Sequence, residues 1–160
     1  MEENMQKFIY ILMGTFILTM LFIVTSCGKT QMKNPDVNDI TNKLIDEVDF
    51  ATLTELDDDR LNFFYKIDDD IIDSYSAYIC GSAGFPDEIA AFKLKDGSDT
   101  QQLKEAINNR RETLVANFKD YRPEEMPKID SSVLFTKGDY VIFVVSNEND
   151  KASDIIKDFF

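Results

Sequence analysis

The chain has 160 residues, a formal net charge of −13 at pH 7 and no histidine. A protein this acidic repels the phosphate backbone of nucleic acids, and no basic stripe with interleaved aromatic residues offsets that repulsion, so we expect no nucleic-acid partner. The lack of histidine excludes histidine-based catalytic triads, histidine general bases and most zinc sites. We therefore expect neither a metal ion nor another cofactor.

An almost uninterrupted apolar run covers residues 8–24 and is followed by Thr25, Ser26 and Cys27. As a helix this run would be about 25 Å long, which is slightly short for a membrane span and longer than most secretory h-regions. The two small residues can lie extended in a peptidase groove, and the thiol after them is a nucleophile that a lipid donor can alkylate. This ending is typical of a bacterial lipoprotein signal peptide, so we predict that residues 1–26 are removed and that Cys27 is lipidated.

The charges that flank the apolar run leave an alternative open. Lys7 precedes the run and Lys29 and Lys33 follow it, whereas the positive-inside rule would favour the reverse bias for a secreted domain. This imbalance weakens the lipoprotein interpretation without reversing it, and an uncleaved signal anchor is the alternative. A buried core helix fits less well because the run is apolar on every face. We expect the domain on the outer face of the bacterial cytoplasmic membrane, with membrane lipid as its partner through Cys27.

Downstream of the leader the sequence predicts one domain. Residues 27–36 are expected to be the lipidated cysteine and a polar tether, and residues 37–160 a single globular domain with a net charge close to that of the whole chain. Its acidic triplets, residues 57–59 and 68–70, do not match a calcium-binding loop, so we interpret them as a helix cap and a solvated turn. Predicted helices cover residues 37–48, a segment that follows 57–59, residues 99–120, and a C-terminal segment that Asn149 or Asp150 caps.

Four strands are predicted from alternating and β-rich segments. The last is apolar on both faces, which favours a central strand with cover on each side. Residues 50–56 are ambiguous, and residues 121–130 are expected to end a helix at a proline and continue as a loop. We expect an α+β fold, in which the first helices are followed by a ββα-ββα order and a four-stranded antiparallel sheet has its helices packed mainly on one face. The predicted strands cover residues 74–80, 88–95, 133–136 and 140–145.

Three polar or reactive residues of this domain are candidates for a site. Glu88 begins a strand and Arg122 ends a helix, so the two can converge on a ligand or pair with each other across the sheet edge. A surface ion pair, which contributes under about 1 kcal/mol, is the simpler interpretation. Cys80 ends a strand, and we expect it to be a buried, reduced thiol that reagents reach only after unfolding. A nucleophilic role for this thiol would need a neighbouring base, which the sequence does not reveal.

Four segments of the domain, residues 64–68, 87–93, 121–125 and 138–146, resemble the recurring segments of one family. It is a family of small lipoproteins from Gram-positive anaerobes that is catalogued only as a domain of unknown function. The resemblance covers most of residues 37–160 and rests on strand and turn patterns. It implies a lipid-anchored extracytoplasmic domain, and it carries over no catalytic residue, cofactor or ligand.

The sequence leaves two classes of function. The first is a non-enzymatic module of the cell envelope that binds a protein partner, a small ligand or an envelope component. The second is an envelope hydrolase with an unrecognised active site. The chain has no histidine, no Gly-x-Ser-x-Gly elbow and no metal-binding motif, and these absences favour the binding module.

Overall fold

The computed structural model describes residues 33–67 and 69–160, which form an α+β domain. The predicted signal peptide, Cys27 and all but the end of the tether lie outside the described residues. The part of the chain that the structure describes contains five α-helices and one five-stranded sheet. Within these ranges no helix is both long enough and apolar enough to cross a membrane.

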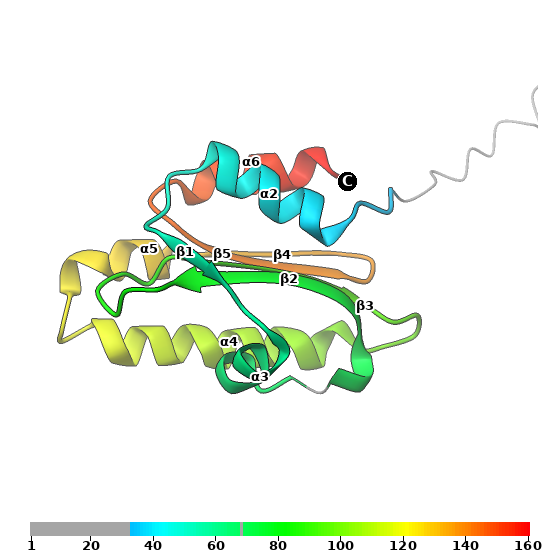
Figure 1. Cartoon of the computed structure of the whole chain (residues 1–160), viewed down its shortest axis with the longest axis horizontal. Helices are drawn as coiled ribbons and strands as arrows, with labels where there is room; N and C mark the ends of the chain where they lie inside the picture. The colour runs from blue at the N-terminus through cyan, green and yellow to red at the C-terminus, as the bar shows by residue number, and fades with distance from the viewer. Residues whose placement is uncertain (1–32, 68) are drawn as a thin grey trace, which may run out of the picture. The chain divides into compact units, whose positions relative to one another are not determined.

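An antiparallel sheet forms the middle layer of the domain, with the strand order β1-β2-β3-β5-β4 (Figure 1). The central strand is β3, whose Ala90 pairs with Ala77 of β2 on one side and with Phe143 of β5 on the other. The hairpin around Gly138 is confirmed, since β4 and β5 pair with each other. The strands are β1 Leu53–Glu55, β2 Ile72–Cys80, β3 Glu88–Leu94, β4 Val133–Lys137 and β5 Tyr140–Val145.

The sheet has one strand more than the four that the sequence predicts. The additional strand, β1, is three residues long and begins with Leu53, which pairs with Cys80 at the end of β2. Three residues are too few to establish an alternating pattern. The strand therefore depends on its pairing with β2, which is distant in the sequence.

Helices cover both faces of the sheet, so the expectation that they lie mainly on one face is wrong (Figure 1). The physical reason lies in β3 and β5, whose residues are almost all buried, which requires cover on each side. We call the two sides the α2/α6 face and the α3/α4 face. The helices are α2 Val37–Glu47, α3 Asp58–Tyr65, α4 Thr100–Phe118, α5 Met126–Asp130 and α6 Asn149–Asp158.

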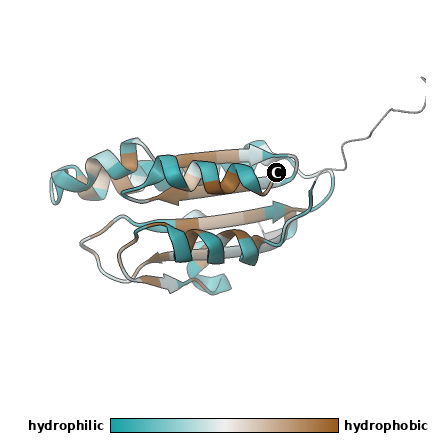
Figure 2. Ribbon diagram, turned by 90° about the horizontal axis from the view of Figure 1, so that it is seen from above, coloured by the Kyte–Doolittle hydropathy of each residue, from teal (hydrophilic) through white to brown (hydrophobic). Residues whose placement is uncertain are grey.

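Alternation along the strands divides the apolar residues between two cores. In β5, Val141 and Phe143 face α3 and α4, whereas Ile142 and Val144 face α2 and α6. Figure 2 shows strands that are largely brown and helices in which teal residues alternate with brown ones. The α2/α6 core also contains Ile40 and Leu44 of α2 and Ala152, Ile155 and Ile156 of α6, and the α3/α4 core contains Leu61 and Tyr65 of α3 and Leu103, Ile107, Leu114 and Phe118 of α4.

Aspartate side chains cap three helices, and the interpretation of residues 57–59 as a helix cap is confirmed. The carboxylate of Asp36 accepts a hydrogen bond from the amide of Asn38, that of Asp57 from Arg60, and that of Asp99 from Gln101. Each carboxylate satisfies a backbone amide that the first helical turn leaves without a partner.

Among the described residues, no group of three or more His, Cys, Asp or Glu side chains is arranged to hold a metal ion.

Two predicted details near the C-terminus are wrong. Residues 121–130 are not a loop throughout, because a 3-10 turn over Pro123–Glu125 continues into α5. Neither Asn149 nor Asp150 is the N-cap of α6, which is Glu148. The side-chain oxygen of Asn149 instead accepts from the amide of Ser146 at 2.9 Å, and its amide donates to the carbonyl of Lys128 at 2.9 Å. Asn149 therefore joins the end of β5 to α5.

Candidate functional site

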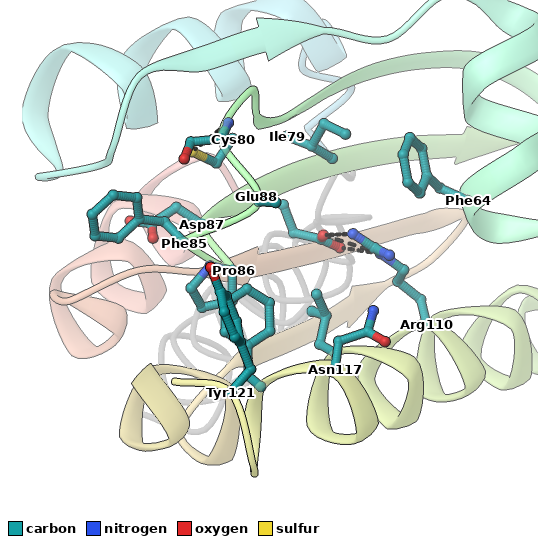
Figure 3. A pocket seen from close by; sticks show the side chains of 14 residues that line it. Phe64, Ile79, Cys80, Phe85, Pro86, Asp87, Glu88, Arg110, Asn117 and Tyr121 are labelled. Atoms are coloured by element: carbon teal, nitrogen blue, oxygen red, sulfur yellow. Dashed lines mark hydrogen bonds and ion pairs between the residues drawn. The ribbon is translucent and has the colours of Figure 1, made fainter. Parts of the chain in front are cut away.

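A groove with several aromatic side chains lies on the α3/α4 face, between α3, α4 and the connection from β2 to β3 (Figure 3). Its volume is about 410 Å³, which is within the usual range for small-ligand sites. A second cavity of about 630 Å³ adjoins it and shares Phe64, Arg110 and Asn117 in its lining. We call the first cavity the aromatic groove; its lining includes Phe64, Cys80, Ser82, Phe85, Asp87, Glu88, Arg110, Asn117, Phe118 and Tyr121.

A buried ion pair between Glu88 and Arg110 lies at the base of the aromatic groove. The guanidinium donates side-on, with Nε 3.0 Å and Nη2 2.6 Å from Oε2 of Glu88. Tyr65 donates its hydroxyl to the other carboxylate oxygen, Oε1, at 2.8 Å. The exposed fractions are 1% for the Glu88 side chain and 9% for that of Arg110, so water screens this pair little.

The positions of Glu88 and Arg110 in their elements explain why the two meet. Glu88 is the first residue of β3 and has the same parity as Ala90 and Phe92, which face the α3/α4 core. Arg110 occupies a position in the buried stripe of α4, between Ile107 and Leu114. A charge in an apolar stripe is costly unless it is paired, and Glu88 supplies the pairing charge.

Burial and charge set the protonation of this cluster. Burial opposes the charge on Arg110, but the carboxylate of Glu88 outweighs it and raises the pKa of the guanidinium. Burial, reinforced by the charge of Glu88, raises the pKa of the Tyr65 hydroxyl well above its ordinary value. The ring of Phe64 also lies 4.8 Å from the guanidinium carbon of Arg110, which is cation–π geometry. Tyr65 therefore stays a hydrogen-bond donor, and Arg110 stays a cation.

A second ionic network fixes the loop between β2 and β3. Lys128 of α5 lies 3.0 Å from Oδ2 of Asp87 and 2.8 Å from Oε2 of Glu125. Burial opposes the charge on Lys128, but these two carboxylates outweigh it and raise the pKa of the amine. The other oxygen of Asp87 accepts from the amide of Ala51 at 3.2 Å. Residues before β1, the loop before β3 and α5 are thus joined through one buried carboxylate.

The two residues singled out from the sequence, Glu88 and Arg122, have different ionic partners. Glu88 pairs with Arg110, so the expectation that it forms a surface ion pair is wrong. Arg122 pairs with Glu124 at 2.5 Å and with Glu125 at 3.4 Å. Its guanidinium also lies 5.1 Å from the centre of the Phe85 ring. Glu88 therefore belongs to the base of the aromatic groove. Arg122 does not line the groove, but it contacts the ring of Phe85, which does.

Cys80 is only partly buried and lines the aromatic groove, so the expectation of full burial is wrong. The reason is that β2 ends at Cys80, where the chain leaves the sheet and the backbone amide of Ser82 turns back to the sulfur at 3.4 Å. The thiol of this residue is free.

Sequence reasoning did not identify Arg110, Tyr65 or Asn117 as site residues. A signal for Arg110 was present, because a charged residue at a buried position of an amphipathic helix requires a buried partner. The other residues carried no comparable signal, because their contribution depends on which helix faces which loop.

Residues 46–146 match the model of a family described as Domain of unknown function (DUF4358). The matched segment extends from the end of α2 to the end of β5 and contains every residue of the aromatic groove. No curated protein matches the chain, and no solved structure matches it.

Proposed function

The chain belongs to the DUF4358 family, and we propose that it is a lipid-anchored protein on the outer face of the bacterial cytoplasmic membrane whose domain binds a ligand in the aromatic groove. The role is one of binding, and the module is not an enzyme. The observation that carries the binding role is the gathering of exposed aromatic side chains around one groove that has an ionic base.

Exposed aromatic residues concentrate on the α3/α4 face. Four large hydrophobic side chains stand out as exposed in the described part of the chain, and three of them border the aromatic groove or its adjoining cavity. These are Phe63, Phe85 and Tyr121, with exposed fractions of 74%, 38% and 67%. Exposing such side chains together has no benefit for folding, and clusters of this kind mark binding surfaces. Ile45 is the fourth, and it belongs to α2.

The ionic groups at the base of the groove favour binding over hydrolysis. Both oxygens of Glu88 accept hydrogen bonds, from Arg110 and from Tyr65. A hydrolase needs an acid or base that is free to exchange a proton with the substrate, within hydrogen-bond reach. The side chains of this cluster are engaged with one another, and such an arrangement holds a shape and a charge distribution.

The anchoring part of the proposal rests on the order of small residues and Cys27 after the apolar run. Two acyl chains bury enough methylene groups for stable anchoring, at about 0.8 kcal/mol each. The domain end of the tether is tied down, because the hydroxyl of Tyr140 lies within hydrogen-bond distance of two acceptors, Oδ1 of Asn34 at 2.6 Å and the carbonyl oxygen of Pro35 at 2.9 Å. The chain from Cys27 to Asn34 can then span at most about 23 Å.

The anchor is tested by the intact mass of the protein extracted from membranes. We expect a polypeptide that begins at Cys27 and carries the mass of a diacylglyceryl group, and we expect Cys27→Ala to remain unprocessed and unlabelled by lipid. A wild-type polypeptide that begins at Met1 without lipid mass would show an uncleaved signal anchor.

The binding role is tested by placing a photocrosslinking amino acid at position 121 or, as the matched control, at position 45 of the full chain. Both positions are exposed, but Tyr121 lines the aromatic groove after the end of α4, whereas Ile45 belongs to α2. In the native envelope we expect discrete crosslinked products from position 121 and none from position 45. Equal yields from both positions would show that the groove has no specific occupant.

A further inference from the structure

We propose that the aromatic groove binds an uncharged glycan that carries N-acetyl groups, such as the amino-sugar strands of a cell wall. This inference rests on the proposed binding function and names the class of ligand. It follows from four properties of the groove, which are its charge balance, the arrangement of groups along α4, its aromatic rings and the absence of a sheet edge in its lining.

The charge balance of the groove selects an uncharged ligand. Glu88 is paired with Arg110, and Asp87 is paired with Lys128, so each charged group that lines the groove already has a counterion. In the adjoining cavity, Asp59 and Lys66 carry opposite charges. The net charge of −13 repels anionic polymers and anionic headgroups. A cationic ligand would find no carboxylate in the groove that is not already neutralised.

Three residues along α4 and the turn after it present the groups that a sugar with an acetamido substituent requires. Arg110, Asn117 and Tyr121 are separated by seven and four positions, and all three line the groove from this side (Figure 3). Nε and Nη2 of Arg110 donate hydrogen bonds to Glu88. Nη1 of Arg110 has no hydrogen-bond partner among the described residues and can donate to a carbonyl of the ligand. The exposed amide of Asn117 offers both a donor and an acceptor.

The aromatic rings beside these groups supply flat surfaces for the apolar face of a sugar ring. The ring of Tyr121 is largely exposed, and Phe85 is held in place by the cations of Arg122 and Lys128, which lie 5.1 Å and 5.4 Å from its centre. The adjoining cavity borders the groove at Phe64, Arg110 and Asn117 and offers room beyond one sugar ring. A short run of linked sugars therefore fits better than a single one.

A peptide fits this groove less well. An extended peptide binds by adding a strand to a free sheet edge, but the edge strands β1 and β4 contribute no residue to the lining. An amphipathic helix needs a continuous apolar trough, whereas here Arg110, Asn117 and Ser82 interrupt the apolar wall. The hydrogen-bonding groups named above also all belong to side chains and not to the backbone. Such groups suit the hydroxyl and acetamido groups of a sugar better than the main chain of a peptide.

The test is a calorimetric titration of the full chain in a detergent that has no sugar headgroup. The probes are the tetrasaccharide of β-1,4-linked N-acetylglucosamine and the β-1,4-linked glucose tetrasaccharide, which has the same linkage and lacks the N-acetyl groups. We expect the N-acetylated probe to bind at least about tenfold more tightly, because loss of one or two hydrogen bonds has that effect. Equal affinity or no binding of either probe would overturn the inference.

Variants connect the binding to the groove. We expect Tyr121→Ala to weaken binding of the N-acetylated probe about tenfold, and Asn117→Ala to abolish the preference over the glucose probe. Asn108→Ala, on the same helix but outside the lining, is the matched control and should bind like the wild type. Circular dichroism at the titration temperature verifies that each variant is folded.

The two proposals can fail separately. If position 121 gives discrete crosslinks in the envelope but the full chain binds neither tetrasaccharide, the domain is a binding module and its ligand is of another class. A crosslinked product that proves to be a polypeptide would lead to the same conclusion. If the N-acetylated probe binds but Cys27 carries no lipid, the ligand class stands and the anchor is wrong.

Discussion

The two faces of the sheet are covered by similar numbers of helices and stabilised in different ways. On the α2/α6 face the buried residues are mostly aliphatic, and a hydrogen bond of 2.7 Å between the hydroxyls of Thr41 and Ser76 joins α2 to β2. On the α3/α4 face the apolar core surrounds an ion pair, Glu88 with Arg110, and opens into the aromatic groove. The α2/α6 face is therefore filled by packed apolar side chains, whereas the α3/α4 face contains a buried ion pair and a cavity.

This difference indicates that the residues of the α3/α4 face serve a purpose other than the stability of the fold. Burying an ion pair costs several kcal/mol of desolvation per ion, and apolar residues of similar size are often as stabilising or more so. Among the described residues, the α2/α6 core is apolar apart from the hydroxyls of Thr41, Ser76 and Tyr140, so this fold can cover a sheet face without a buried ion pair. The pair on the α3/α4 face is therefore better explained by the groove above it than by the needs of folding.

The largest expected effect comes from removing the cover of the α2/α6 face. Deleting residues 150–160 exposes Ile142 and Val144 and removes the buried Ile155 and Ile156. Each large side chain contributes about 1.5–3 kcal/mol by burial, so we expect a loss of about 5 kcal/mol or more in the free energy of unfolding. Urea denaturation of the otherwise full chain measures it, with Lys157→Ala as an exposed control on the same helix. An unchanged midpoint would show that α6 is dispensable.

The next effect distinguishes the two kinds of core. Arg110→Ala leaves the carboxylate of Glu88 buried without its counterion, and we expect the free energy of unfolding to fall by about 3–5 kcal/mol. Replacing both partners, as Glu88→Leu with Arg110→Leu, removes the unpaired charge and should restore most of that loss. Denaturant titration of the single and double variants provides the comparison. A double variant no more stable than the single one would mean that the ion pair itself holds the face together.

Much of the fold could be predicted because its signals are local. The helix cap at Asp57 depends on a few adjacent residues, and the hairpin at Gly138 depends on one turn. What the sequence did not provide is the side of the sheet on which each helix packs. That choice depends on connections that cross the sheet edge, and strand β1 shows the same limit because only its pairing with Cys80 defines it.

The site was less predictable than the fold for a related reason. Glu88 could be singled out as a polar residue at a strand start, but its partner lies 22 positions away on another element. Arg122 was chosen with it because both lie at the ends of elements, and in the structure each has other partners. The charge of Arg110 within an apolar stripe was the one local sign of a buried pair, and it does not specify the partner.

A third, smaller effect concerns alkaline pH. The pKa of Tyr65 is raised well above its ordinary value by burial, so the folded chain keeps this hydroxyl protonated when the unfolded chain, near pH 10, begins to lose the proton. Its contribution to stability is complete below pH 10 and is lost as the pH rises through the folded pKa. We expect the free energy of unfolding to fall above pH 10 by up to about 1.4 kcal/mol per pH unit from this group, and Tyr65→Phe to remove that part of the slope.

Tyr140 on the other face provides the comparison for Tyr65. Its pKa is raised from the ordinary value by partial burial, which the ammonium of Lys93 opposes. Tyr140→Phe should therefore flatten the alkaline decline less than Tyr65→Phe does. Urea titrations at pH 8 to 11 give both slopes, and equal slopes for the two variants would show that Tyr65 is no more strongly shielded than Tyr140.

The smallest expected effect on stability is also the one that separates the groove from the core beneath it. Tyr121 has 67% of its surface exposed, whereas Phe118, three positions earlier at the end of α4, is 6% exposed. We expect Tyr121→Ala to change the free energy of unfolding by no more than about 0.5 kcal/mol, and Phe118→Ala to lower it by about 3–5 kcal/mol. Denaturation of both variants, with Ile45→Ala as an exposed control on α2, measures the contrast. Since Tyr121 contributes little to folding, any loss of binding in Tyr121→Ala reports on the groove alone. A destabilisation of more than about 1 kcal/mol in Tyr121→Ala would place this side chain in the core and remove the strongest reason for regarding the aromatic rim as a binding surface.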